Sequence, residues 1–302
     1  MNNQNVNVLI VEDNPDDVVL LREGLAEEKE ATFNITEVDR TSKAIQCLQE
    51  TIVDVVLLDL SLPDSSGLDT LKQVHAHYPE IPIVVSTGLR NKATAMQAVR
   101  EGAQDYLVKG EFQGRELTHT LWYAIERKRL ENQLYHDAYY DALTALPNRA
   151  CFMKRLSFAT RRAQEDKSYN FAVFFLDVDG FKQINDRHGH AAGDHLLRTI
   201  AQRLKSGVRP SDMAARLGGD EFTVLLEDVG DETMVRGLAE RLLDKIQIAL
   251  DLDGKIVPIS VSLGVTLSTR GYNDLYDALR DADEAMYESK RSGGHGLAIS
   301  RG

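Results

Sequence analysis

The first third of the chain alternates between short apolar runs and amphipathic stretches, an order that leaves few folds open. The pattern predicts strands at Val6–Val11, Phe33–Val38, Val53–Asp59, Ile81–Ser86 and Asp105–Lys109. It predicts helices at Pro15–Glu27, Ser42–Glu50, Gly67–His77 and Lys92–Glu101. Strands that alternate with helices form a parallel sheet covered on both faces, and ligands bind at the carboxyl ends of such strands. We therefore expect a doubly wound α/β domain with its functional residues just after the strands.

Polar side chains occur at those strand ends. They are Glu12 and Asp13 after the first strand, Asp59 at the third, Thr87 after the fourth and Lys109 at the fifth. Each alone could be a helix cap, a turn residue or a solvated strand end. Together they fit one chemistry, because three carboxylates can hold Mg²⁺, one of them can accept a phosphoryl group, and a hydroxyl and an ammonium can neutralise it.

This segment, over residues 1–125, resembles the receiver domain of two-component response regulators. The matching motifs are Leu9-Ile10-Val11-Glu12-Asp13-Asn14, Leu57-Leu58-Asp59-Leu60-Ser61-Leu62-Pro63-Asp64, Ser86-Thr87-Gly88 and Tyr106-Leu107-Val108-Lys109-Gly110. The resemblance implies a flavodoxin-like domain of five parallel strands, and a histidine kinase or phosphotransfer protein as partner. It makes Asp59 the phosphoacceptor, with a Mg²⁺ site formed by Glu12, Asp13, Asp59 and the Ser61 carbonyl. Phosphoryl contacts would come from Thr87 and Lys109, and Tyr106 would be the switch residue.

Residues 112–140 predict a helical connector that continues the last receiver helix. Its apolar residues recur at mostly helical spacing, at Leu117, Leu121, Ala124, Ile125, Leu130 and Leu134. No Pro or Gly interrupts the segment from Arg115 to Leu146. A helix of this length is longer than one small sheet can cover, so we expect a stalk that pairs with a second copy as a coiled coil. Lys128 and Glu131 interrupt the apolar seam along which the two helices would pair.

The second half contains the segment Arg216–Leu226, in which Gly218-Gly219-Asp220-Glu221 separates two apolar runs. Alternating runs on both sides predict a β-hairpin. The two glycines permit positive φ and a close approach to a ligand, and the two carboxylates offer oxygens to a hard cation. On these four residues alone, an ordinary hairpin with an acidic, solvated turn is the favoured interpretation, and the other motifs of the chain reverse that preference.

The remaining elements of residues 141–302 predict an α/β domain around a mainly antiparallel sheet. After the turn-rich segment Asp141–Arg149, helices are expected from the cap Asn148 to Arg162 and at Ala192–Ser206, Glu232–Leu250 and Asn273–Ser289, with strands at Phe171–Leu176 and Ile256–Leu267. This half resembles the GGDEF family of diguanylate cyclases, through the signature hairpin, the segment Asp177-Val178-Asp179-Gly180-Phe181-Lys182-Gln183-Ile184-Asn185-Asp186 and further motifs in order. The resemblance implies a fold like the palm of nucleotide cyclases and a reaction that joins two GTP molecules into cyclic di-GMP and two pyrophosphates.

The same resemblance assigns roles to residues. Metal, Mg²⁺ or Mn²⁺, would be held by Asp177, the Val178 carbonyl, Asp220 and Glu221. Asp220 is the candidate general base, and the catalytic set is Asp220, Glu221 and Lys182. Phosphate contacts would come from Gly180, Phe181, Lys182 and Lys290, and guanine would be read by Asn185 and Asp194. Gly218 and Gly219 would also contact the bound GTP.

Two further features bear on regulation and binding. Arg209 and Asp212 match the family's inhibitory RxxD site for bound product. The alternative is an ordinary pair of surface residues in a loop, which would contribute little to stability. The family often places an Arg four residues after Lys290, whereas this chain has Gly294. Arg291 and His295 are the alternatives for that role.

The overall charge and composition narrow the classes of partner. A net charge of −12 argues against nucleic acid and anionic membranes as partners. No run approaches the ~20 apolar residues of a membrane span, and the first residues lack the features of a signal peptide, so a cytoplasmic protein is expected. The two cysteines, Cys47 and Cys151, have no metal spacing and predict neither zinc nor a disulfide.

The reading that combines these features is a phosphorylation-controlled diguanylate cyclase with product inhibition. It would work as a homodimer through the receiver and the connector, because each chain presents one GTP and the reaction needs two. The alternative is a catalytically silent GGDEF domain that binds cyclic di-GMP and signals to a partner. The intact Asp177, Asp220 and Glu221 argue against it.

Overall fold

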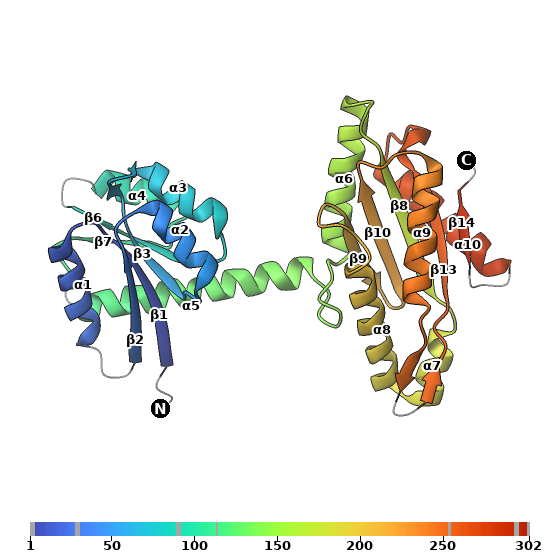
Figure 1. Cartoon of the computed structure of the whole chain (residues 1–302), viewed down its shortest axis with the longest axis horizontal. Coiled ribbons are helices and arrows are strands. Elements are labelled where there is room, and N and C mark those ends of the chain that lie inside the picture. Colours follow the sequence, from blue (N-terminus) through green and yellow to red (C-terminus); the bar gives the residue numbers. More distant parts are fainter. Residues whose placement is uncertain are drawn as a thin grey trace. The chain divides into compact units, whose positions relative to one another are not determined.

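The structure is a computed structural model that describes residues 4–27, 31–88, 92–112, 114–252, 255–292 and 296–300. It divides into two compact units, Met1–Leu134 and Tyr135–Gly302 (Figure 1). Among the described residues, no helix combines the length and the apolar character needed to cross a membrane.

The first unit is built on a five-stranded parallel sheet. Its strands are β1 (Gln4–Val11), β2 (Ala31–Val38), β3 (Val55–Asp59), β6 (Ile83–Thr87) and β7 (Asp105–Val108). They lie in the order β2-β1-β3-β6-β7, and all four neighbouring pairs are parallel. The doubly wound fold expected from the alternating pattern is confirmed. A small hairpin of β4 (Ser61–Leu62) and β5 (Ser65–Ser66) follows β3.

Helices cover both faces of this sheet. One face packs against α1 (Pro15–Ala26) and α5 (Gly114–Tyr139), and the other against α2 (Thr41–Glu50), α3 (Leu68–His77) and α4 (Lys92–Arg100). The Asp64 carboxylate starts α2, because it accepts hydrogen bonds from the backbone N–H groups of Thr41 and Ser42, both at 3.0 Å. Its slight burial acts to raise the pKa of Asp64, but these hydrogen bonds lower it to about 2.

The connector is one continuous helix, since α5 runs for 26 residues from Gly114 to Tyr139. Its apolar residues, however, do not form one stripe. Leu117, Leu121 and Ala124 are buried in the core of the first unit. Tyr123, Leu130 and Leu134 are 73%, 52% and 69% exposed, and their spacings of seven and four residues place them on another face of the helix.

The two polar residues expected to interrupt a seam, Lys128 and Glu131, lie on the side of the helix that faces the first unit instead. The Lys128 side chain is only 13% exposed, and the Gln104 amide donates to Glu131 Oε2 at 3.0 Å. Asn132 also donates to the Glu80 carbonyl at 2.9 Å. The single interrupted seam read from the sequence is therefore wrong. One face of α5 packs on the first unit well past Ala124, and a separate apolar stripe stays exposed.

The second unit has a mixed sheet in the order β14-β13-β8-β10-β9. Its strands are β8 (Phe171–Val178), β9 (Met213–Gly218), β10 (Glu221–Glu227), β13 (Val261–Leu267) and β14 (Leu297–Ile299). The β13–β14 pair is parallel and the other three pairs are antiparallel, as expected. The strand expected at Ile256–Leu267 is divided, because Pro258 cannot donate to a ladder and separates β12 (Lys255–Val257) from β13. β12 pairs instead with β11 (Leu250–Leu252).

The helices of this unit again lie on both faces of the sheet. α8 (His190–Lys205) and α9 (Glu232–Ile246) pack on one face, and α6 (Arg149–Glu165) and α10 (Leu275–Arg291) on the other. The expected cap of α6 is confirmed, since the Cys151 N–H donates to Asn148 Oδ1 at 3.1 Å. α10 approaches β13 so closely that a Cβ on Gly264 would lie 2.0 Å from the Ala282 carbonyl oxygen. Short α7 (Phe181–His188) and a 3-10 turn at Ser268–Arg270 complete the unit.

Candidate functional sites

Three carboxylates meet at the carboxyl edge of the first sheet. Glu12, Asp13 and Asp59 each offer an oxygen, and these oxygens all lie within 4.8 Å of one another. Glu12 and Asp59 are only 4% and 6% exposed. Carboxylates this close repel one another unless a cation lies between them, and an all-oxygen donor set suits Mg²⁺. The arrangement therefore fits a divalent metal.

Lys109 supplies a positive charge at this edge. Its Nζ lies 2.7 Å from Glu12 Oε2, 2.7 Å from Asp59 Oδ2 and 2.8 Å from Asp17 Oδ2. Burial by itself lowers the pKa of Lys109, but the three carboxylates raise it above its ordinary value. Burial also raises the pKa of Glu12, against the effect of Lys109. Asp17 was not anticipated, because an acidic residue in the first turn of a helix has an ordinary role beside the helix dipole.

The other predicted residues of this site lie at the same edge. Thr87, 2% exposed, ends β6, and its carbonyl accepts the Lys109 backbone N–H at 2.8 Å. The Ser61 N–H donates to Asp59 Oδ1 at 3.0 Å. Tyr106 is half-buried on β7 and packs against the core. The fold thus gathers Thr87, Lys109 and Ser61 around Asp59.

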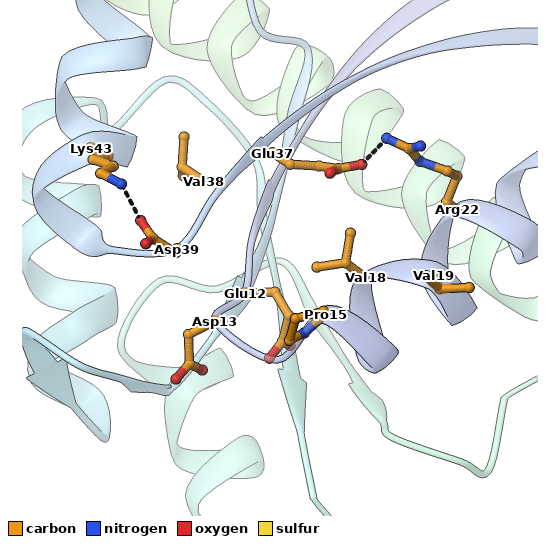
Figure 2. A pocket seen from close by; sticks show the side chains of 10 residues that line it. All are labelled: Glu12, Asp13, Pro15, Val18, Val19, Arg22, Glu37, Val38, Asp39 and Lys43. Carbon is orange, nitrogen blue, oxygen red and sulfur yellow. Dashed lines mark hydrogen bonds and ion pairs between the residues drawn. The ribbon is translucent and has the colours of Figure 1, made fainter.

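A cavity of about 540 Å³ opens beside this cluster (Figure 2). Glu12 and Asp13 line it, together with Pro15 and Val18 of α1. Two ion pairs, Arg22–Glu37 and Lys43–Asp39, also border it. The acidic cluster is therefore open to a hollow on the side where α1 and α2 begin.

In the second unit the signature segment forms the expected hairpin. β9 ends at Gly218 and β10 begins at Glu221, and Gly218 and Gly219 have φ values of 148° and 52°. Only glycine adopts this pair of conformations without strain, which explains the two glycines. Asp220 therefore lies at the tip, and its carbonyl accepts the Val178 N–H at 3.3 Å. Glu221 is the cross-strand neighbour of Asp177 on β8.

The carboxylates near the tip carry unbalanced negative charge. Burial raises the pKa of Asp177, and Asp220 adds to this, while the hydrogen bond from Lys290 Nζ to Asp177 Oδ1 at 2.6 Å acts to lower it. Burial also raises the pKa of Glu221, with further contributions from Asp283 and Asp177. Charge of this sign is what a divalent cation neutralises. Among the described residues, only the trio of the first unit brings three such oxygens within 4.8 Å, so Asp177, Asp220 and Glu221 are spaced more widely.

Arg216 ties this hairpin to the start of the second unit. Its Nη1 lies 2.8 Å and 3.0 Å from the two Asp141 carboxylate oxygens. Its Nε and Nη2 donate to the Gly219 carbonyl at 3.1 Å and 2.7 Å. Asp141 follows α5 by two residues, so one guanidinium joins the end of the connector to the hairpin tip. Neither residue stood out in the sequence, because they lie 75 positions apart.

The residues expected to contact the nucleotide surround the start of α7. Gly180, with φ 69°, precedes this helix, Phe181 begins it and Lys182 is exposed. Asn185 Oδ1 is buried without a hydrogen-bond partner. Asp194 lies near the start of α8, four residues after His190, and is half-buried.

Arg209 and Asp212 form a backbone-linked turn. Asp212 Oδ2 accepts the Arg209 N–H at 3.0 Å, and Asp212 Oδ1 accepts the Glu227 N–H at 3.2 Å. The two residues line a cavity of about 430 Å³ together with Tyr140 and Pro147. Arg209 itself is exposed, so its guanidinium is available to a ligand.

That Arg291 or His295 replaces the phosphate-binding Arg expected at position 294 stays a prediction from the sequence. Gly294 and His295 lie outside the described residues. Arg291 is the last residue of α10, directly after Lys290.

Comparison with known proteins identifies the family of each half of the chain. Residues 138–295, more than half of the chain, match the family model described as diguanylate cyclase, GGDEF domain. The chain belongs to the GGDEF domain family. Residues 8–121 match the response regulator receiver domain, so a receiver domain precedes the GGDEF domain.

Individual relatives match the GGDEF part. Diguanylate cyclase TpbB of Pseudomonas aeruginosa is 45% identical over 159 residues, which cover 52% of this chain and 36% of that protein. Probable diguanylate cyclase DgcE of Escherichia coli is 38% identical over 169 residues, covering 56% and 15%. The chain thus spans about a third or less of the length of these curated relatives.

Solved structures agree with the fold of the GGDEF domain. The GGDEF domain of TpbB, also called YfiN, from Pseudomonas aeruginosa has a TM-score of 0.52 at 42% identity, covering 54% of this chain and 95% of that one. The coiled coil and GGDEF domain of DgcB from Caulobacter crescentus, in complex with c-di-GMP, has a TM-score of 0.56 at 29% identity, covering 61% and 97%.

Proposed function

We propose that the protein is a diguanylate cyclase that joins two GTP molecules into cyclic di-GMP and releases two pyrophosphates. The observation that carries this proposal is the grouping of Asp177, Asp220 and Glu221 at the end of β8 and the tip of the β9–β10 hairpin. The cation of Lys290 lies beside them. Membership of the GGDEF family and the similarity to named diguanylate cyclases support the same reaction.

The chemistry suits these residues. Mg²⁺ or Mn²⁺, held by Asp177, the Val178 carbonyl, Asp220 and Glu221, would neutralise the triphosphate. Asp220 at the hairpin tip accepts the proton of the attacking ribose 3′-hydroxyl. Lys290, together with Lys182 and the backbone N–H groups at Gly180 and Phe181, binds phosphate oxygens. Asn185 and Asp194 read the guanine edge.

The test is product analysis with the full chain, GTP and Mg²⁺, the products being separated by mass. Asp220→Ala should form no cyclic di-GMP yet unfold at the same denaturant concentration as the parent, because a hairpin-tip carboxylate carries little packing. Asp244→Ala, an exposed carboxylate on α9, is the matched control and should keep parent activity. If the parent binds cyclic di-GMP but never forms it, the silent-module alternative holds.

We further propose that two copies pair through the receiver and the exposed stripe of α5. Each chain would carry one GTP site and the reaction needs two GTP molecules, which favours a dimer. Tyr123, Leu130 and Leu134 offer an apolar surface suited to a second copy. Leu130→Glu should lower both the dimer fraction and the rate per chain, with recovery of the rate at higher protein concentration.

We also propose two controls of the cyclase rate: phosphorylation of Asp59 raises it, and cyclic di-GMP bound at Arg209 lowers it. The parent should respond to a phosphodonor, and Asp59→Asn should not, in rate and in oligomer mass. Arg209→Ala should keep the initial rate and lose inhibition by added cyclic di-GMP. Equal responses of parent and variant would remove each regulatory claim while leaving the enzyme claim intact.

A further inference from the structure

Asp179 is an acidic residue for which the proposed reaction has no role. It follows β8 directly, between Val178 and Gly180, whose backbone is proposed to contact metal and phosphate. Its carboxylate accepts hydrogen bonds from two serine hydroxyls, that of Ser262 at 2.8 Å from Oδ1 and that of Ser260 at Oδ2. This carboxylate therefore ties the residue after β8 to the start of β13.

The two serines are placed to act together. They flank Val261 at the start of β13, and residues two apart in an extended chain project to the same side. Val261 itself is buried in the core of the second unit. The Ser262 side chain is fully buried, so its hydroxyl needs a partner inside the protein. Asp179 Oδ1 supplies that partner.

The backbone of the turn after β8 is held on both sides. The Asp179 N–H donates to the Ser260 carbonyl at 3.0 Å, on the side of β13. The Val178 N–H donates to the Asp220 carbonyl at 3.3 Å, on the side of the hairpin tip. Gly180 follows with φ 69° and precedes α7. The Asp179 side chain thus reinforces the attachment of the turn to the β13 side.

This turn carries groups of the proposed GTP site whose direction the backbone alone decides. The Val178 carbonyl is a proposed metal ligand, and the N–H groups at Gly180 and Phe181 are proposed phosphate contacts. A backbone group cannot adjust by changing rotamer, so its direction depends on how the peptide planes are held. Removing a side chain that orients metal ligands typically lowers metal affinity or activity by about 10- to 100-fold.

We propose that Asp179 is a positioning residue, which through Ser260 and Ser262 sets the direction of the backbone groups that the turn presents to the metal and the triphosphate. It contacts neither of them itself. The inference rests on the proposed function, because it assumes that the triphosphate of GTP binds at this turn. The property that matters is the pair of hydrogen bonds that Asp179 accepts, and not its negative charge.

The first test is equilibrium binding of GTP and GMP to the full chain, with Ca²⁺ in place of Mg²⁺. Asp179→Ala should weaken GTP binding about tenfold, the lower end of the effect of removing such an orienting partner. GMP keeps the base but lacks two of the three phosphates, so its binding should weaken by less than about twofold, because the proposed base contacts lie on α7 and α8. A general packing defect would weaken both nucleotides alike.

Variants that preserve hydrogen bonding separate positioning from direct ligation. Asp179→Asn keeps one acceptor and adds a donor, and serine hydroxyls can pair with both, so GTP affinity and initial rate should stay within about threefold of the parent. A metal ligand would lose far more in this variant, because its charge is removed. Ser260→Ala combined with Ser262→Ala should reproduce the loss seen in Asp179→Ala. Adding Asp179→Ala to that pair should then change little further.

Asp166→Ala is the matched control. The Asp166 carboxylate also accepts a serine hydroxyl, that of Ser168 at 2.6 Å, but it lies in the exposed turn before β8, at the other end of the strand. This variant should bind both nucleotides like the parent. If Asp179→Ala does not fold in chemical denaturation, the double serine variant takes its place in the comparison of GTP with GMP.

Three results would overturn the proposal. They are equal losses for GTP and GMP, a loss in Asp179→Asn as large as that in Asp179→Ala, and parent affinity for GTP in the double serine variant. A parent that does not prefer GTP to GMP would also overturn it. Failure of the proposed function looks different. A parent that prefers GTP but forms no cyclic di-GMP contradicts the reaction, and loss of that preference in Asp179→Ala still supports the positioning role.

Discussion

Breaking the pair between Asp141 and Arg216 should impair both the stability of the GGDEF domain and its activity. The two side chains are 22% and 11% exposed, and the guanidinium contacts both carboxylate oxygens. In Asp141→Ala the guanidinium keeps only the Gly219 carbonyl. The hairpin tip that presents Asp220 and Glu221 then loses its link to the start of the domain.

The size of the effect follows from the lost contacts. Hydrogen bonds to charged groups contribute about 1.5–3 kcal/mol net, and partial exposure favours the lower part of that range. We expect the free energy of unfolding to fall by about 2 kcal/mol at pH 7. Burial acts to raise the pKa of Asp141, but Thr144 and Arg216 hold it below its ordinary value of 3.8. The stabilisation is therefore present above pH 3.8 and is lost as the pH falls below it.

The assay is chemical denaturation of the parent and variant at pH 7, paired with initial rates of cyclic di-GMP formation under conditions where both are folded. A tip displaced by the lost link should lower kcat by about tenfold, which corresponds to ~1.4 kcal/mol of transition-state stabilisation. Arg280→Ala is the control, because its pair with Asp277 is exposed at 61% and 44% and should contribute less than about 1 kcal/mol. If Asp141→Ala matches the parent in both measurements, the structural link carries neither stability nor activity.

Three further variants test other contacts. Asp17→Ala should weaken Mg²⁺ binding to the receiver about threefold by calorimetry, because a nearby negative charge is lost and Lys109 then competes more strongly for the metal ligands; unchanged affinity would contradict this. Asp64→Ala should cost the receiver about 1 kcal/mol in urea unfolding at pH 7. That difference should disappear as the pH falls from 3.8 toward about 2, and persistence at low pH would exclude the charged cap. Gly264→Ala should cost about 3 kcal/mol because the added Cβ meets the backbone of α10, whereas Gly237→Ala should stabilise slightly; equal effects would refute the close approach.

Much of the fold was predictable because local rules govern it. The alternating apolar runs predicted the parallel sheet of the first unit, whose side chains need two covered faces. Gly218 and Gly219 predicted the tight hairpin, because glycine can adopt the positive φ that such a turn requires. The break between β12 and β13 was not predicted, because the alternating pattern suggested one strand through Pro258, whose missing N–H divides it.

The candidate sites were predictable in part, for a related reason. Glu12 follows β1 and Asp59 ends β3, and the carboxyl ends of parallel strands share an edge, so their meeting could be predicted without knowledge of side-chain positions. Asp17 and Lys109 are 92 residues apart, and no local pattern relates a first-turn helix residue to a strand end. The buried and the exposed apolar stripes of α5 could likewise not be told apart in the sequence. Spacing shows which residues share a helix face, but not which face packs against the rest of the protein.

The sequence by itself determined the periodicities, the turns and the order of the motifs, because these depend on neighbours within a few residues. Only the tertiary structure decided that Arg216 joins Asp141 to the Gly219 carbonyl and that Ser260 and Ser262 hold the Asp179 carboxylate. Both are contacts of a few ångströms between separate elements. Their free energies fall off steeply with distance, so they exist only once helices and strands are packed against one another.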